Sequence, residues 1–284
     1  MNLGGTRLVL VAHGSRDVRA ARSTRGLARA VARRLAVHAP VPAVQERRLP
    51  GPRVPVRHGA VPPYGPVSAA FLDFAQPRLP EVLAAAAGRG ESAAIVVPLL
   101  LTAAYHGRVD VPADIERARA AGIPVEVGLA KVLGPVDGAV LDRRALDLMT
   151  SALIRRLDQA GALGGADGIL LAGAGSREDA ALRTVGLVAD ALGAALSRPC
   201  RAGYASGGGP GVAEAMAALR ADGARRIAVG SYFLAPGLLH DRVITQALDA
   251  GALGVAGPLG AAPEIARLVL LRAEAARVPD PVAA

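Results

Sequence analysis

Short apolar runs of Val, Ile, Leu and Ala alternate with longer segments of helical period along most of the chain. Nearly continuous apolar runs are typical of strands that are buried on both faces of a parallel sheet. The predicted strands span Arg7–Ala12, Val67–Leu72, Ala93–Val97, Pro124–Leu129, Gly168–Ala172, Pro199–Ala205 and Arg226–Ser231. The predicted helices span Asp17–Val37, Pro77–Gly88, Val111–Ala121, Asp137–Ala160, Arg177–Ser197, Pro210–Asp222, Asp241–Ala250 and Pro263–Arg277. This alternation predicts an α/β fold with small parallel sheets flanked by helices.

Two loose internal repeats divide the chain into tandem halves, near 1–135 and 136–284. The repeated segments are AHGSR (12–16) with GAGSR (173–177), and IVVPLLLTAAYHGRV (95–109) with IAVGSYFLAPGLLHDRV (227–243). The first pair is offset by 161 residues and the second by 133. The first half therefore carries about 28 additional residues, which we place in 39–67.

The insert at 39–67 contains eight prolines. Proline lacks a backbone N–H, so this density excludes an ordinary helix or a central strand. We expect a long excursion, either a flap over a site or a disordered loop.

Composition narrows the class of protein. Hydrophobic residues make up 52% of the 284 residues and aromatic residues only 2%, which predicts a core of Ala, Val and Leu. The single cysteine, Cys200, leaves no intrachain disulfide and fits a reducing cytoplasm. The sequence shows neither a signal peptide nor an apolar run of roughly 18 residues, so we expect a cytoplasmic protein with no membrane partner.

The net charge of +9 favours an anionic partner. The arginines are scattered and aromatic side chains for stacking on bases are few, which argues against a nucleic acid. A polyanionic small molecule remains the best match to this charge.

Three side chains able to carry chemistry follow predicted strands of the first half, namely His13, Asp73 and His106. The carboxyl ends of parallel strands open on one edge of a sheet, so we expect all three to face one cleft. Two imidazoles and a carboxylate suit a divalent transition metal, and they equally suit proton transfer near neutral pH. A histidine at a strand end can also cap the next helix, and Asp73 alone can be a surface acid or a helix cap.

The second half reads as a degenerate copy without metal chemistry. Ala174 stands where His13 would be, and Ser206 stands where Asp73 would be, although His240 aligns with His106. The GGGPG run at 207–211 lacks the Lys and Ser/Thr of a nucleotide loop, so a helix-start turn is favoured over a phosphate cradle.

The segments LVLVAHGSRD (8–17), AAFLDFAQPRLPEVL (69–83) and VVPLLLTAAYHGRVDVPADI (96–115) together resemble the sirohydrochlorin chelatase family, in its tandem two-domain form. These are the cobaltochelatases and ferrochelatases of class II. The resemblance implies two Rossmann-like units with a cleft between them. It also implies insertion of Fe²⁺ or Co²⁺ into sirohydrochlorin, for sirohaem or cobalamin biosynthesis.

The resemblance further implies roles for individual residues. His13 and His106 would bind the metal, and Asp73 would stand where the family commonly has Glu. Ser15, Arg16, Tyr105 and Arg108 would bind the substrate, the two arginines by pairing with its carboxylates. The metal would be a substrate rather than a permanently bound cofactor. The chain would act as a monomer with pseudo-dimeric halves or as a homodimer.

Two alternatives remain open at this point. One is a metal- or tetrapyrrole-binding protein of the same fold that has no catalysis. The other is a phosphate-ligand α/β enzyme that uses His13 as a nucleophile, although a second phosphate-binding site rich in Arg and Gly is not evident. The residue types do not separate Fe²⁺ from Co²⁺ or exclude Ni²⁺.

Overall fold

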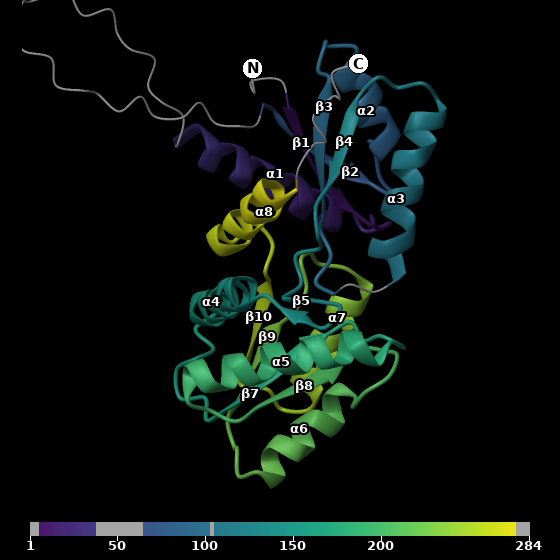
Figure 1. Ribbon diagram of the computed structural model, residues 1–284. Coiled ribbons are helices and arrows are strands. Elements are labelled where there is room, and N and C mark those ends of the chain that lie inside the picture. The colour runs from purple at the N-terminus through teal and green to yellow at the C-terminus, as the bar shows by residue number, and fades with distance from the viewer. Residues whose placement is uncertain (1–5, 38–64, 103–104, 277–284) are drawn as a thin grey trace, which may run out of the picture.

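The computed structural model describes residues 6–37, 65–102 and 105–276, and the side chains of 105–109 lie outside the described part. It contains two four-stranded parallel sheets, each flanked by helices (Figure 1). The predicted α/β fold class is confirmed. Most of the Pro-rich insert at 39–67 falls outside the described residues. The histidines His38, just before the insert, and His58, within it, also fall outside them.

The first sheet has the strand order β2-β1-β3-β4, and all its pairs are parallel. Its elements along the chain are β1 (Thr6–Ala12), α1 (Val18–Val37), β2 (Val67–Phe71), α2 (Leu79–Ala87), β3 (Ala93–Pro98), α3 (Tyr105–Ala120) and β4 (Glu126–Leu129). β1 pairs with both β2 and β3, so the chain crosses from one side of β1 to the other between them.

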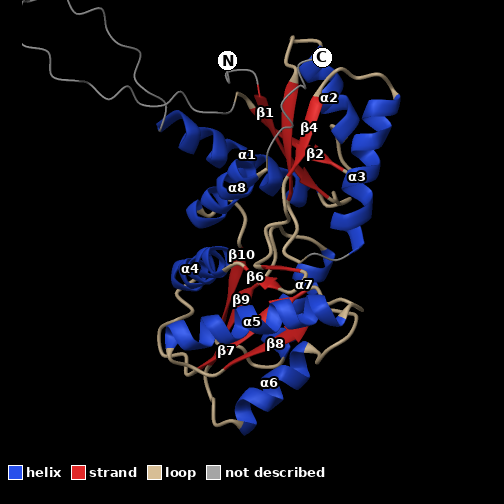
Figure 2. Cartoon of the chain, viewed as in Figure 1, coloured by secondary structure: helices blue, strands red, loops and turns tan. Residues whose placement is uncertain are grey.

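The second sheet repeats this order, as β8-β7-β9-β10. Its elements are β7 (Gly168–Gly173), α5 (Asp179–Leu196), β8 (Cys200–Tyr204), α6 (Val212–Ala221), β9 (Ile227–Ser231), α7 (Leu238–Asp249), β10 (Gly254–Pro258) and α8 (Pro263–Ala275). The hairpin strands β5 (Val136–Asp137) and β6 (Val140–Leu141) and the helix α4 (Arg143–Gln159) lie between the two sheets along the chain (Figure 2).

Two predicted helices begin six residues away from their observed starts, and three strands were not predicted. The helix predicted over 137–160 begins only at Arg143, because Asp142 caps it: the Asp142 carboxylate accepts a hydrogen bond from the Ala145 N–H at 3.0 Å. The residues before Asp142 form the β5–β6 hairpin, and β10 was not predicted. α3 begins at Tyr105 rather than Val111, so Pro112 lies inside the helix instead of starting it.

Hydrophobic residues form a central core that both sheets share. It joins one face of each sheet with α1, α4, α5 and α8. The opposite face of the first sheet packs under α2 and α3, and that of the second under α6 and α7. Along β1, Leu8 and Leu10 point into the central core while Val9 and Val11 point the other way, as strand alternation requires.

The last helix crosses back to the first sheet. α8 packs against α1 and β3 as well as against α4 (Figure 1). From α8, the buried Arg272 donates hydrogen bonds to the Val132 and Gly134 carbonyls at 2.7 and 2.9 Å and forms an ion pair with Asp142 at 2.6 Å. α8 thereby fixes the segment that joins the halves. The division at residues 135 and 136 stays a prediction.

Candidate active site

His13 lies at the topological switch point of the first sheet. It directly follows β1, which pairs with β2 on one side and with β3 on the other. Ligands of open α/β sheets bind at such a switch point, beyond the carboxyl ends of the strands. Backbone hydrogen bonds extend the ladder past the strand ends: the Asp73 N–H donates to the His13 carbonyl, and the Leu99 N–H donates to the Val11 carbonyl, both at 2.7 Å.

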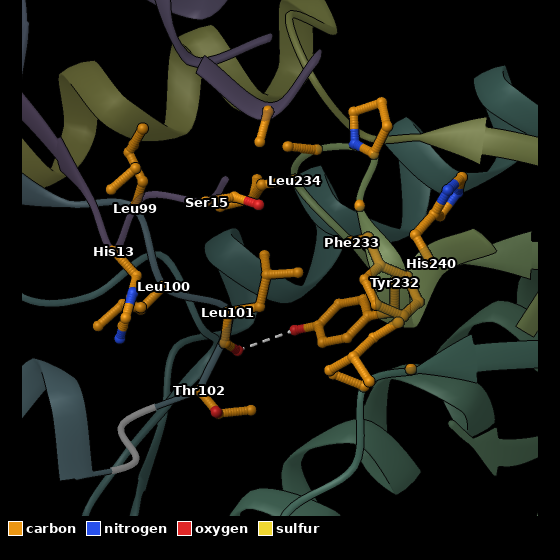
Figure 3. A pocket seen from close by; sticks show the side chains of 18 of the residues that line it. His13, Ser15, Leu99, Leu100, Leu101, Thr102, Tyr232, Phe233, Leu234 and His240 are labelled. Carbon is orange, nitrogen blue, oxygen red and sulfur yellow. Dashed lines mark hydrogen bonds between the residues drawn. The ribbon is translucent and has the colours of Figure 1, made fainter. Parts of the chain in front are cut away.

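A cavity of about 510 Å³ opens at this place, between the two halves. Its size is that of a small-molecule site. Four strand-end loops line it, at 12–15, 99–102, 173–176 and 232–240. Figure 3 shows His13 and His240 on opposite sides of the cavity, with Leu101 and Tyr232 between them. The lining is largely apolar, as is usual for sites that bind small molecules.

The loops of the second half have the same backbone hydrogen bonds as those of the first. The Ser206 N–H donates to the Ala174 carbonyl at 3.2 Å, in the place of the Asp73–His13 bond. Likewise the Tyr232 N–H donates to the Ala172 carbonyl at 2.8 Å. Because Ala174 accepts the equivalent backbone hydrogen bond without an imidazole side chain, the fold does not require an imidazole at the position of His13.

Ser15 has a structural use that both halves share. Its hydroxyl oxygen accepts a hydrogen bond from the Asp17 N–H at 3.1 Å, and Ser176 accepts one from the Glu178 N–H at the same distance. Such a bond stabilises the turn into a helix. A role of Ser15 in substrate binding stays a prediction.

The imidazole of His13 lies parallel to an aromatic ring that follows β2. The ring centroids of His13 and Phe74 are 6.3 Å apart and their planes differ by 19°. The guanidinium carbon of the exposed Arg16 lies 5.3 Å from the Phe74 ring centroid. His13 and Arg16 therefore both lie beside the Phe74 ring, although Arg16 is not among the described residues that line the cavity. A role of Arg16 in substrate binding stays a prediction.

Asp73 is close to His13 but its carboxylate is engaged in its own turn. It accepts hydrogen bonds from the Phe74 N–H at 2.9 Å and from Arg78 at 3.1 Å. These two bonds hold the pKa of Asp73 below its usual value, so the group is a carboxylate at neutral pH. Asp73 is not among the described residues that line the cavity.

The second predicted metal-binding histidine lies on α3. His106, Tyr105 and Arg108 belong to the first turn of this helix, and their side chains are outside the described part of the structure. Among the side chains that are described, no three His, Cys, Asp or Glu gather in a metal-binding arrangement. The metal-binding role of His106 with His13 stays a prediction.

His240, on α7, is a buried residue that lines the cavity. Its side chain is 5% exposed, and neither ring nitrogen has a hydrogen-bond partner in the described part of the chain. Its ring stands edge-on to Phe233, with centroids 5.2 Å apart. Burial lowers the pKa of His240, while Asp241, with Oδ1 3.7 Å from Nδ1, opposes this shift.

We expect the His240→Leu variant to change how stability depends on pH. The native state holds His240 neutral, so the unfolded state binds more protons below about pH 6.5, the ordinary pKa of histidine. Wild type therefore loses stability as the pH falls from about 6.5 towards the lowered native pKa, and the variant does not have this loss. The variant also removes a buried ring that has no hydrogen-bond partner among the described residues, and the burial of such a polar group costs about 1–3 kcal/mol.

Urea unfolding from pH 5 to pH 8 measures this effect. The variant should be at least as stable as wild type at pH 8 and should gain relative to wild type as the pH falls. Parallel stability curves for the two proteins would show that His240 does not titrate with unfolding.

Polar contacts join the two halves beside the cavity. Arg19, on α1, forms ion pairs with Asp17 and with Asp241 of α7, and these pairs raise the pKa of the guanidinium. The Tyr232 hydroxyl donates to the Leu101 carbonyl at 3.0 Å (Figure 3). The Ser23 hydroxyl donates to the Leu234 carbonyl at 3.1 Å. Both walls of the cavity are therefore held together within one chain.

Comparison with known proteins agrees with this architecture. A model of the CbiX family matches residues 56–144 and 168–276. The chain belongs to the CbiX family. The matched ranges include Asp73, α3 and α7, whereas β1 and His13 precede them. The position of His13 at the cavity is therefore known from the structure and not from the family match.

One curated relative of this CbiX-family chain is the sirohydrochlorin ferrochelatase of Priestia megaterium, which is 25% identical over 175 residues. The match spans 61% of this chain and 62% of that relative.

Two solved structures share the fold over nearly the whole chain. SirB from Bacillus subtilis with Fe³⁺ has a TM-score of 0.67 at 20% identity, covering 95% of this chain and 94% of SirB. The sirohydrochlorin chelatase SirB of Bacillus subtilis subspecies spizizenii, in complex with cobalt, has a TM-score of 0.65 at 19% identity and the same coverage. The prediction of two tandem chelatase-like units is thus confirmed at the level of the fold. In the part of the chain that is described, no helix has the length and apolar character needed to cross a membrane.

Proposed function

We propose that this CbiX-family chain is a sirohydrochlorin chelatase, which inserts Fe²⁺ or Co²⁺ into the macrocycle. One observation carries the proposal: an imidazole, His13, stands at a mostly apolar cleft between two halves whose strand-end loops make equivalent backbone hydrogen bonds, and the other half has Ala174 at that position. An imidazole that the fold does not need is best explained by chemistry in the cleft.

The cleft suits this reaction electrostatically. Sirohydrochlorin carries eight carboxylates around a flat ring, and the chain has a net charge of +9. We assign Arg16 and Arg108 to the carboxylates, and Ser15 and Tyr105 to further contacts with the substrate. The apolar loops at 99–102 and 232–240 would cover the flat faces of the ring.

Insertion exchanges one divalent ion for the two N–H protons of the macrocycle. We assign His13 and His106 to hold the incoming metal substrate and, once the ion has left their ring nitrogens, to accept one of the two protons each, because imidazole does both near neutral pH. Asp73, which remains ionised, would stabilise positive charge that develops on His13. Two imidazoles hold an ion weakly enough to release it into the ring.

The proposed function also assigns a role to each half of the chain. Residues 1–135 would form the catalytic half, and 136–284 the half that completes the cleft without a metal site. The chain would hold no permanent cofactor and would work in the cytoplasm. The choice between sirohaem and cobalamin synthesis follows from which metal it prefers.

An insertion assay followed by ultraviolet–visible spectra tests the proposal. Purified chain is mixed anaerobically with sirohydrochlorin and either Fe²⁺ or Co²⁺, and initial rates are corrected for an enzyme-free blank. We expect a rate proportional to enzyme concentration with at least one metal. Binding of the macrocycle without any catalysed spectral change would instead identify a non-catalytic tetrapyrrole-binding protein.

A further inference from the structure

The turn that follows β2 contains an aromatic residue in an unfavourable backbone conformation. Phe74 has φ 56°, in the left-handed region that bulky side chains rarely adopt. Among the non-glycine residues that the structure describes, only Phe74 and Ser197 have positive φ. Strain of this kind often marks a functional constraint.

The second half shows what the turn itself requires. Its equivalent residue is Gly207, with φ 78°, one residue after Ser206 as Phe74 is one residue after Asp73. The N–H groups of Ser206 and Asp73 make the same hydrogen bonds to Ala174 and His13. The turn needs a positive φ, and glycine meets that need without strain. The first half has an aromatic ring instead.

The Phe74 ring is not part of the hydrophobic core. The residue is 51% exposed, and its ring lies beside the His13 imidazole, 19° from parallel. In the second half the two positions are Ala174 and Gly207, so the imidazole and the phenyl ring occur together and are absent together. This pairing indicates that the strained ring serves the imidazole and not the fold.

We propose that Phe74 is a positioning residue for His13. Its offset stack fixes the plane of the imidazole, and with it the direction of the in-plane lone pair on the unprotonated nitrogen of the neutral ring. A flat macrocycle that meets this lone pair would stand across the imidazole plane. The catalytic consequence rests on the proposed function, whereas the ordering of His13 does not.

Three variants test the proposal. Phe74→Gly removes the ring and the strain, Phe74→Tyr keeps the ring, and Ser197→Gly relieves the other strained residue, which lies at the end of α5 away from the cavity. Each is assayed for thermal stability, for the order of the His13 ring by carbon-13 relaxation, and for kcat and KM of metal insertion.

We expect Phe74→Gly to melt at or above the wild-type temperature. The order parameter of the His13 ring should fall measurably below its wild-type value, and kcat should fall about 10- to 100-fold with little change in KM. Phe74→Tyr and Ser197→Gly should match wild type in ring order and kcat.

Two results would overturn the proposal. An unchanged His13 ring order in Phe74→Gly would remove the positioning role. A fall in melting temperature that accompanies the loss of kcat would assign Phe74 to the fold. If the wild-type chain inserts no metal, the proposed function fails, and the relaxation measurement still decides the role of Phe74.

Discussion

The His13→Ala variant is expected to lose metal insertion while keeping its fold. General acid–base groups contribute about 10²- to 10⁴-fold to a rate, and in our account His13 also holds the metal, so the insertion rate should fall by at least about 100-fold. The melting temperature should stay within about 2 °C of wild type, because Ala174 already occupies the equivalent loop of the second half. Initial insertion rates and thermal unfolding measure the two effects.

A matched control is available on the opposite half. Ser206 takes the place of Asp73 there, is exposed, and is not among the described residues that line the cavity. Ser206→Ala should insert metal at the wild-type rate. If His13→Ala also inserts metal at that rate, then His13 is not part of the reaction and the assigned mechanism is wrong.

The Gly14→Ala variant is expected to show the largest loss of stability. Gly14 has φ 97°, and a Cβ atom there would lie 1.7 Å from the Asp73 carbonyl oxygen. Neither backbone can retreat easily, because the neighbouring His13 carbonyl accepts a hydrogen bond from the Asp73 N–H at 2.7 Å. Steric overlap with backbone should cost more than about 4 kcal/mol, enough to unfold a marginally stable domain.

Gly90→Ala separates this overlap from the backbone conformation alone. Gly90 also has a positive φ, 78°, but a Cβ atom there meets nothing within 4 Å. It should cost only the left-handed conformation, about 1–2 kcal/mol. Equal losses for the two variants in urea unfolding would show that the loops at His13 and Asp73 do not pack as described.

The strands of both sheets could be predicted because their apolar runs are nearly continuous, as in Leu8–Val11, where every side chain is buried. β10 escaped prediction because Gly254–Pro258 is rich in small residues and has no such run. The start of α3 was misplaced because a proline usually marks the first turn of a helix, whereas Pro112 is the eighth residue of α3.

The candidate site could be predicted only in part. The strand-end positions of His13 and Asp73 follow from periodicity, and the structure brings their backbones within one hydrogen bond. The engagement of Asp73 with Arg78 depends on side-chain geometry that spacing does not reveal. The unusual backbone of Phe74 could have been predicted from the repeat. The equivalent residue is Gly207, and a glycine at that position indicates a positive φ, which Phe rarely adopts.

The location of a bound metal tests the central claim most directly. The claim is that the metal substrate binds on the His13 side of the cleft and that the Ala174 side has no metal site. Anomalous diffraction at the cobalt edge, from crystals of the whole chain with Co²⁺, should show one ion coordinated by a ring nitrogen of His13. Well-ordered Co²⁺ on His240 or at 174–176, with none on His13, would contradict the account.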